Sequence, residues 1–151
     1  MGLFSFIKTA GQKLFGGSET PEEKAKKVQD HVASFGFDLS SVTFSVNEGK
    51  VTVSGEAKNF DEKQKILATA GNVEGIEAVE DALTLKEPLK FEIPDLSKTF
   101  YTVVSGDNLS KISKATYGDP NKYNVIFEAN KPMLSHPDKI YPGQVLFIPQ
   151  I

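Results

Sequence analysis

Few residues in this 151-residue sequence are suited to acid–base, nucleophilic or metal chemistry. It has two histidines, His31 and His136, no cysteine, and no serine in the setting of a nucleophile elbow. The histidines lie in separate halves of the chain, so they make a poor metal site, and we interpret them as surface or capping residues. The chain also lacks an Asp-x-Asp-x-Asp-Gly calcium loop. The sequence therefore favours a binding protein over an enzyme.

The charged residues exclude general nucleic-acid binding. All 17 basic residues are lysines, set against 20 acidic residues, for a net charge of -3. Without arginine there is no planar guanidinium to grip phosphate or guanine at two points, and the negative net charge repels a polyanion. Two acidic groups are interpreted as solvated helix ends or strand faces: Glu19, Glu22 and Glu23, and Glu77, Glu80 and Asp81.

The sequence predicts no membrane span and no secretory signal. No stretch has the roughly 18–20 consecutive apolar residues that a transmembrane segment needs. The apolar residues of the first 15 positions are interrupted by Lys8, Gln12 and Lys13, which a signal peptide would not tolerate. We therefore expect a cytoplasmic protein, and we expect it to be a monomer.

Charge and proline spacing divide the chain into two halves. Residues 1–92 carry 11 lysines against 15 acidic residues, whereas residues 93–151 carry 6 against 5. Pro88 and Pro94 favour an extended connector at the change. The predicted α+β chain has two small domains, with these parts: an N-terminal amphipathic helix (1–19), a first domain (20–86), a linker (87–99) and a second domain (100–151).

The first domain has the pattern α-β-β-α-β. Thr20 and Pro21 are typical of a helix start, and Gly36 of its end. Two alternating strands on either side of residues 47–49 predict a hairpin. A second helix runs from Asn59 to a stop at Gly71-Asn72, and a strand follows over 78–85. The segments GKVTVSG (49–55) and VEGIEAV (73–79) resemble a BON domain, which covers roughly residues 22–86.

The second domain has the pattern β-α-α-β. Its strands are expected over 101–104 and 145–148, and its helices present Leu109 and Ile112, then Ile126, to the core. The segments YTVVSGDNLSKIS (101–113) and IYPGQVLFIP (140–149) resemble a LysM domain along its full length.

The LysM resemblance implies binding of N-acetylglucosamine polymers such as peptidoglycan, in a groove between two loops. The matching positions are Gly106, Asp107, Asn108 and Leu109, and Asp138, Lys139, Ile140 and Tyr141. Asn108 stands where the family usually has threonine. A purely structural interpretation remains open, in which Gly106-Asp107 caps a helix and residues 140–143 form a tight turn.

The N-terminal segment has apolar residues at helical spacing: Leu3, Phe6, Ile7, Ala10 and Leu14. Such a face can lie on a membrane surface, but only Lys8 and Lys13 would attract anionic lipid. We therefore expect this helix to pack onto the first domain, with a frayed tail as the alternative.

A BON domain followed by a LysM domain, behind this amphipathic start, resembles a family of small bacterial potassium-binding proteins. The resemblance implies reversible K⁺ binding by the BON domain, with the LysM domain closing against it. It also makes Rb⁺ and Cs⁺ candidate ligands of the same site. A large, weakly hydrated monovalent cation is matched by neutral carbonyl oxygens, which leave no side-chain signature. By this resemblance the ligands are the backbone oxygens of Ile7, Lys8, Ala10, Gly71, Val73 and Ile76.

Two other functions stay open. One is a cell-envelope protein that binds peptidoglycan through LysM and phospholipid or a partner protein through BON; the missing export signal counts against it. The other is an adaptor whose LysM domain recruits a protein.

Overall fold

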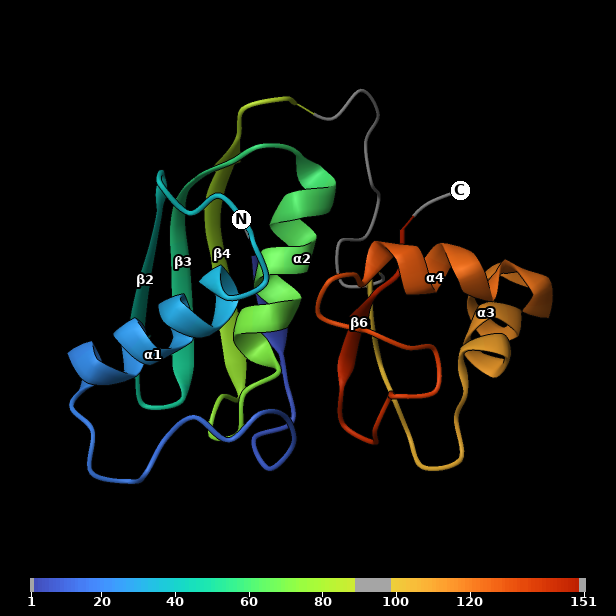
Figure 1. Cartoon of the computed structure of the whole chain (residues 1–151), viewed down its shortest axis with the longest axis horizontal. Coiled ribbons are helices and arrows are strands. Elements are labelled where there is room, and N and C mark those ends of the chain that lie inside the picture. Colours follow the sequence, from blue (N-terminus) through green and yellow to red (C-terminus); the bar gives the residue numbers. More distant parts are fainter. Residues whose placement is uncertain (1, 89–98, 150–151) are drawn as a thin grey trace.

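The computed structural model describes residues 2–88 and 99–149, which form two α+β modules side by side (Figure 1). The first module (2–88) consists of β1 (Gly2–Ser5), α1 (Pro21–Ala33), β2 (Val42–Asn47), β3 (Lys50–Ala57), α2 (Phe60–Gly71) and β4 (Ala78–Leu85). The second module (99–149) consists of β5 (Phe100–Thr102), α3 (Leu109–Tyr117), the 3₁₀ helix Pro120–Lys122, α4 (Tyr123–Ala129) and β6 (Val145–Phe147).

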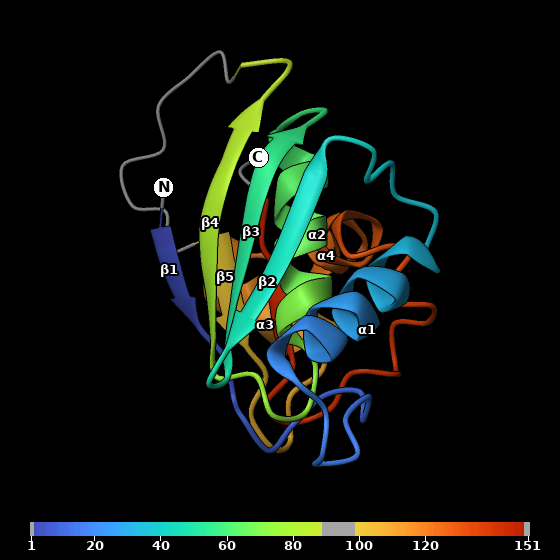
Figure 2. The same ribbon diagram turned by 90° about the vertical axis from the view of Figure 1, so that its left-hand side faces the viewer.

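A four-stranded sheet in the order β1-β4-β3-β2 forms the first module (Figure 2). Strands β3 and β4 are parallel, with α2 as the connection between them, and the two outer pairings are antiparallel. Buried and exposed residues alternate along β2, as expected of a sheet with one covered face. Helix α1 packs on β2 and α2, and α2 packs on β3 and β4, so both helices cover the same face.

Local signals predict most of this module correctly. The Thr20 hydroxyl accepts from the Glu23 amide, and the Glu23 carboxylate accepts in return from the Thr20 amide, which makes a complete capping box. The Asn59 side chain caps α2 by accepting from the Glu62 amide at 2.9 Å. At the tip of the hairpin Gly49 has φ +83, a conformation open to glycine at little cost.

The predicted N-terminal helix is wrong, because this segment forms strand β1. Gly2 to Ser5 pair antiparallel with Asp81 to Ala78 on the edge of the sheet. Phe4 and Phe6 are both buried, whereas Leu3 is 63% exposed and Ile7 is 45% exposed. Residues two apart share a face in a strand but not in a helix, so the apolar pattern fits the strand.

The second module packs its two helices on a two-stranded antiparallel sheet, β5 with β6. The side chain of Asn108 caps α3 by accepting from the Lys111 amide at 2.8 Å. Asn130, at the end of α4, bonds with both the N–H and the C=O of Phe147, each at 2.8 Å. The core consists of Val103, Leu109, Ile112, Ile126, Leu134, Leu146 and Ile148.

The two modules meet along α2 and β6, which face each other in Figure 1. Aromatic rings fill this seam: Phe4 lies edge-on to Phe100 at 4.7 Å, and Phe60 lies edge-on to Phe147 at 6.1 Å. Val145 belongs to the same buried cluster as the core of the first module. The modules therefore share buried apolar surface.

The predicted linker spans 87–99, and its residues 89–98 lie outside the described residues, as do residues 150–151 at the end of the second domain. Before this gap, the Glu87 amide donates to the Lys58 carbonyl at 2.9 Å. After it, the Thr99 carbonyl accepts from the Ile148 amide at 2.7 Å. Within the described ranges, no helix has the length and apolar character to cross a membrane.

Candidate functional site

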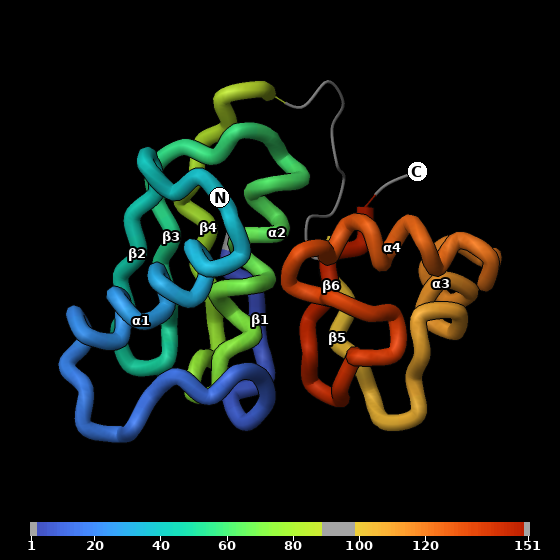
Figure 3. Tube along the Cα trace, viewed as in Figure 1, coloured from blue at the N-terminus to red at the C-terminus, as the bar shows by residue number. Residues whose placement is uncertain are grey.

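The segment after β1 is bonded to the turn after α2. We call residues 6–12 the N-terminal loop and residues 71–77 the helix-exit turn. Figure 3 shows the blue N-terminal chain passing below α2 and the sheet on its way to α1. Four backbone hydrogen bonds join the two segments, donor first: Phe6 to Glu77 at 2.9 Å, Gln12 to Asn72 at 3.0 Å, Glu74 to Gln12 at 2.8 Å and Gly75 to Lys8 at 2.7 Å.

Glycine makes this close approach possible. Gly11 has φ +106, and a Cβ built on it would lie 2.5 Å from the carbonyl carbon and oxygen of Asn72. Next along the chain, Gln12 forms a parallel bridge with Val73. Only a residue without a side chain lets the two backbones lie this close.

The two segments contain all six carbonyls predicted to bind an ion. Three already accept one backbone hydrogen bond: that of Ile7 from Ala10 at 3.1 Å, that of Lys8 from Gly75 at 2.7 Å, and that of Val73 from Ile76 at 3.0 Å. A carbonyl has two lone pairs, so each keeps one for another ligand. Among the described residues, no hydrogen bond reaches the carbonyls of Ala10, Gly71 and Ile76.

Electrostatics at this junction favour a cation. The helix-exit turn begins at Gly71, the last residue of α2, where the macrodipole is negative and the last carbonyls lack intrahelical partners. The last turn of α2 contains no basic residue to balance that partial charge. The described part of the chain gathers no set of three His, Asp or Glu side chains suited to a metal ion.

The second module reaches the same junction. A Cβ on Gly143 would lie 2.7 Å from the Ala10 Cβ and 3.4 Å from the Ile7 Cβ. Tyr141 lines a shallow hollow together with Ile7 and Ala10. Burial raises the pKa of Tyr141 to about 12, so its phenol stays neutral at ordinary pH. Ile7 and Ala10, predicted to bind the ion, therefore lie next to Tyr141, predicted to bind glycan.

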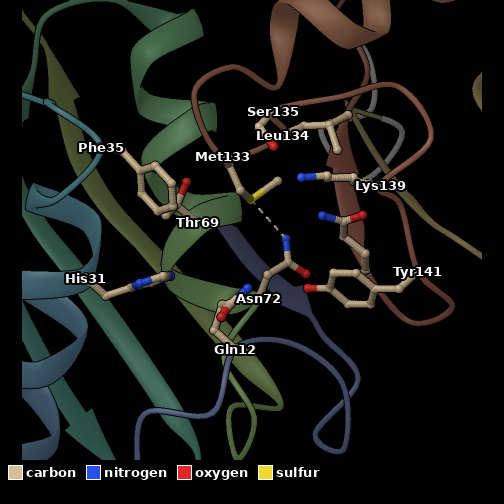
Figure 4. A pocket seen from close by; sticks show the side chains of 11 residues that line it. Gln12, His31, Phe35, Thr69, Asn72, Met133, Leu134, Ser135, Lys139 and Tyr141 are labelled. Carbon is tan, nitrogen blue, oxygen red and sulfur yellow. Dashed lines mark hydrogen bonds between the residues drawn. The ribbon is translucent and has the colours of Figure 1, made fainter.

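A second cavity lies beside Asn72, between the two modules (Figure 4). Gln12 and His31 line it from the first module, and Met133 and Tyr141 from the second. His31 is half-buried and edge-on to Phe35, and its burial lowers its pKa. His136 is exposed, and its Nδ1 accepts from the Asp138 amide.

The glycan-site candidates serve the fold of the second module. The Asp107 carboxylate accepts from the Tyr101 hydroxyl at 2.8 Å and from the Val104 amide at 3.0 Å. The Asn108 side chain is the α3 cap, and Leu109 is buried in the core. Gly106, Asp138 and Lys139 are exposed, and Ile140 packs partly against the core. Oδ2 of Asp107 and the amide oxygen of Asn108 therefore already serve the fold of the second module.

Sequence reasoning missed two polar features. Asp81, interpreted as solvated, is 1% exposed and forms an ion pair with the Lys63 ammonium at 2.7 Å. Asn72 was expected only to stop a helix, yet its side chain bonds with Val145, 73 residues later. The alternation of β4 could have placed Asp81 on the buried face with Val79, but no local signal identifies the partner of Asn72.

Comparisons with known proteins agree with this architecture. A BON domain model matches residues 22–87, and a LysM domain model matches residues 101–149. The chain is 49% identical, over 99% of both sequences, to the potassium binding protein Kbp of Escherichia coli O6:H1. It is also 47% identical over 64 residues to an uncharacterized protein of Deinococcus radiodurans, 24% of whose length is matched. The chain belongs to the Kbp family, in which a BON domain is followed by a LysM domain.

Proposed function

We propose that this chain is a cytoplasmic, monomeric K⁺-binding protein that captures the ion reversibly through backbone carbonyls and performs no catalysis. The ion lies where the N-terminal loop meets the helix-exit turn, and the ligands are drawn from the carbonyls of Ile7, Lys8, Ala10, Gly71, Val73 and Ile76. The Escherichia coli relative Kbp, which is 49% identical to this chain, is a potassium binding protein. Ion capture orders both segments and favours closure of the LysM domain against the BON domain.

The observation that carries the proposal is the set of four hydrogen bonds between the N-terminal loop and the helix-exit turn. They bring two carbonyl-rich segments to the negative end of α2 with no basic residue in its last turn. Neutral oxygens suit a large, weakly hydrated ion, whereas a carboxylate cage would favour smaller or divalent ions. We therefore expect K⁺ to bind, Rb⁺ and Cs⁺ to compete with it, and Na⁺ to bind much more weakly.

Calorimetric titration with K⁺, Rb⁺, Cs⁺ and Na⁺ at constant ionic strength tests the proposal. Saturable binding of K⁺ but not Na⁺ supports it, and absence of any K⁺ binding rejects it. Crystals grown in RbCl test the site itself, because rubidium scatters anomalously. An anomalous peak within contact distance of the Ala10, Gly71 and Ile76 oxygens supports the assignment, and a peak elsewhere overturns it.

A further inference from the structure

Asn72 is bonded to three parts of the molecule at once. Its backbone N–H donates to the Ala68 carbonyl at 3.0 Å, which ends α2. Its backbone C=O accepts from the Gln12 amide at 3.0 Å, which holds the N-terminal loop. Its side chain bonds with Val145 of β6, where Nδ2 donates to the carbonyl at 2.7 Å and Oδ1 accepts from the amide at 2.8 Å.

The Asn72 side chain bonds with backbone groups of β6 that a neighbouring strand would otherwise pair with. In an antiparallel pair, alternate residues direct N–H and C=O away from the partner. On β6 these outward groups belong to Val145 and Phe147, and each pair is bonded by one asparagine amide. Asn130, which serves Phe147, is part of the second module, whereas Asn72 comes from the first. The outward N–H and C=O of Val145 are therefore bonded only when the first module lies against β6.

We propose that Asn72 is the positioning residue that transmits ion capture to the LysM domain, an inference that rests on the proposed function. Its backbone (φ −81, ψ 53) lies between the carbonyls of Gly71 and Val73, both assigned to the ion. An ion that fixes those carbonyls also fixes the direction in which the Asn72 amide points. The amide then meets Val145 only in the closed arrangement, so the ion binds that arrangement more tightly.

Two other contacts across the seam, at Phe60 and at Gln64, lack this link. The Phe60–Phe147 contact is apolar and lies at the opposite end of α2 from the helix-exit turn. Gln64 donates to the Thr99 hydroxyl at 2.7 Å, but Gln64 is about two helical turns before Gly71. Asn72 is 5% exposed and is itself a residue of the turn. A directional bond at this position responds to the geometry of the turn.

The test compares Asn72→Ala with Asn124→Ala in the full-length protein. Asn124 is exposed on α4, so its variant makes the same chemical change away from the seam. K⁺ affinity is measured by calorimetry, and module closure by X-ray scattering and by energy transfer between dyes on the two modules, in KCl and in NaCl. We expect Asn72→Ala to retain weaker K⁺ binding, reduced about 5- to 150-fold, and to lose K⁺-dependent closure. Asn124→Ala should behave as the wild type.

Two further variants separate the hydrogen bonds from the space that the side chain fills. Asn72→Leu has the same branched shape but can neither donate to the Val145 carbonyl nor accept from its amide, whereas Asn72→Gln keeps the amide on a side chain one methylene longer. We expect Asn72→Leu to lose K⁺-dependent closure and Asn72→Gln to retain part of it. A residue that merely fills space would give the opposite order.

The outcomes separate the two proposals. If wild-type protein binds no K⁺, the proposed function fails. If it binds K⁺ and closes, but Asn72→Ala binds and closes equally well, the role of Asn72 is overturned while the function stands. If Asn72→Ala does not fold, as judged by circular dichroism, Asn72→Leu decides: K⁺-dependent closure equal to that of the wild type overturns the inference.

Discussion

Lys63 and Asp81 form an ion pair between α2 and β4, with 2.7 Å between Nζ and Oδ2 and little exposure of either side chain. The second carboxylate oxygen of Asp81 accepts from the Leu83 amide at 3.0 Å. The Lys63 ammonium also lies 5.0 Å from the centre of the Phe60 ring, beside the seam. Burial of two charges is tolerated here because each has a close partner.

Removal of one partner should destabilise the first module strongly. We expect Lys63→Met to lower the free energy of unfolding by about 3–5 kcal/mol, because it leaves a buried carboxylate without its counter-ion. The double variant Lys63→Met/Asp81→Asn removes both charges and keeps an acceptor for Leu83, so it should recover most of the loss. Urea unfolding followed by circular dichroism measures both. A single variant as stable as the wild type would contradict the importance of this pair.

A side chain at Gly11 should disturb the ion site more than one at Gly17. Both glycines have positive φ, +106 and +98, so alanine strains the backbone at either position. Only Gly11 abuts Asn72, whereas a Cβ on Gly17 meets nothing within 4 Å. We expect Gly11→Ala to weaken K⁺ binding about tenfold or more, equivalent to ~1.4 kcal/mol, and Gly17→Ala to leave it close to wild type. Equal K⁺ affinities in the two variants would show that the contact is irrelevant.

Glu19 should make stability depend on acid pH. Its carboxylate accepts from Lys27 at 2.5 Å and from the Gly16 amide at 2.6 Å, and these bonds lower its pKa from 4.5 to about 2. A depressed folded-state pKa means that the stabilisation is complete above pH 4.5 and disappears as the pH falls towards 2. The stability difference between wild type and Glu19→Gln should therefore be constant above pH 5 and shrink below 4.5. Denaturant midpoints measured from pH 2 to 7 check this, and a difference that does not change with pH would be incompatible with it.

Peptidoglycan should not retain the protein. Oδ2 of Asp107 is bonded to Tyr101 and Val104, and the amide oxygen of Asn108 caps α3, so the fold already fixes the orientation of both side chains. We expect little protein to sediment with purified sacculi, compared with a LysM protein that binds them. Strong retention that falls on substitution of Tyr141 would instead favour the cell-envelope function.

The sequence predicted those parts of the fold that depend on neighbouring residues. Cap residues and alternating strands located the hairpin at 42–57, helix α2 and strand β4, because their signals lie within a few positions of each other. Strand β1 was missed for the opposite reason. Its four residues become a strand through pairing with β4, and their apolar spacing alone also fits a helix.

The candidate site was predictable only in part. The two carbonyl-rich segments came from family resemblance, and the four bonds that join them depend on contacts between residues 60 or more positions apart. The polar partners of Asn72 and Asp81 were not predicted, since a side chain that reaches another module or another element leaves no periodic pattern. Hydrophobic periodicity specifies what is buried, but not which polar group a buried group meets.

The pairing of Gly2 with Asp81 bears on the order in which the molecule is assembled. During synthesis β1 emerges first, yet it has no place to dock until β4 has been made and has paired with β3. Closing so long a stretch of chain is entropically costly, and such contacts form slowly. We therefore expect docking of β1 to be a late folding event that delivers the N-terminal loop to an almost finished domain. A nascent chain would then acquire its affinity for the ion only after the rest of that domain has folded.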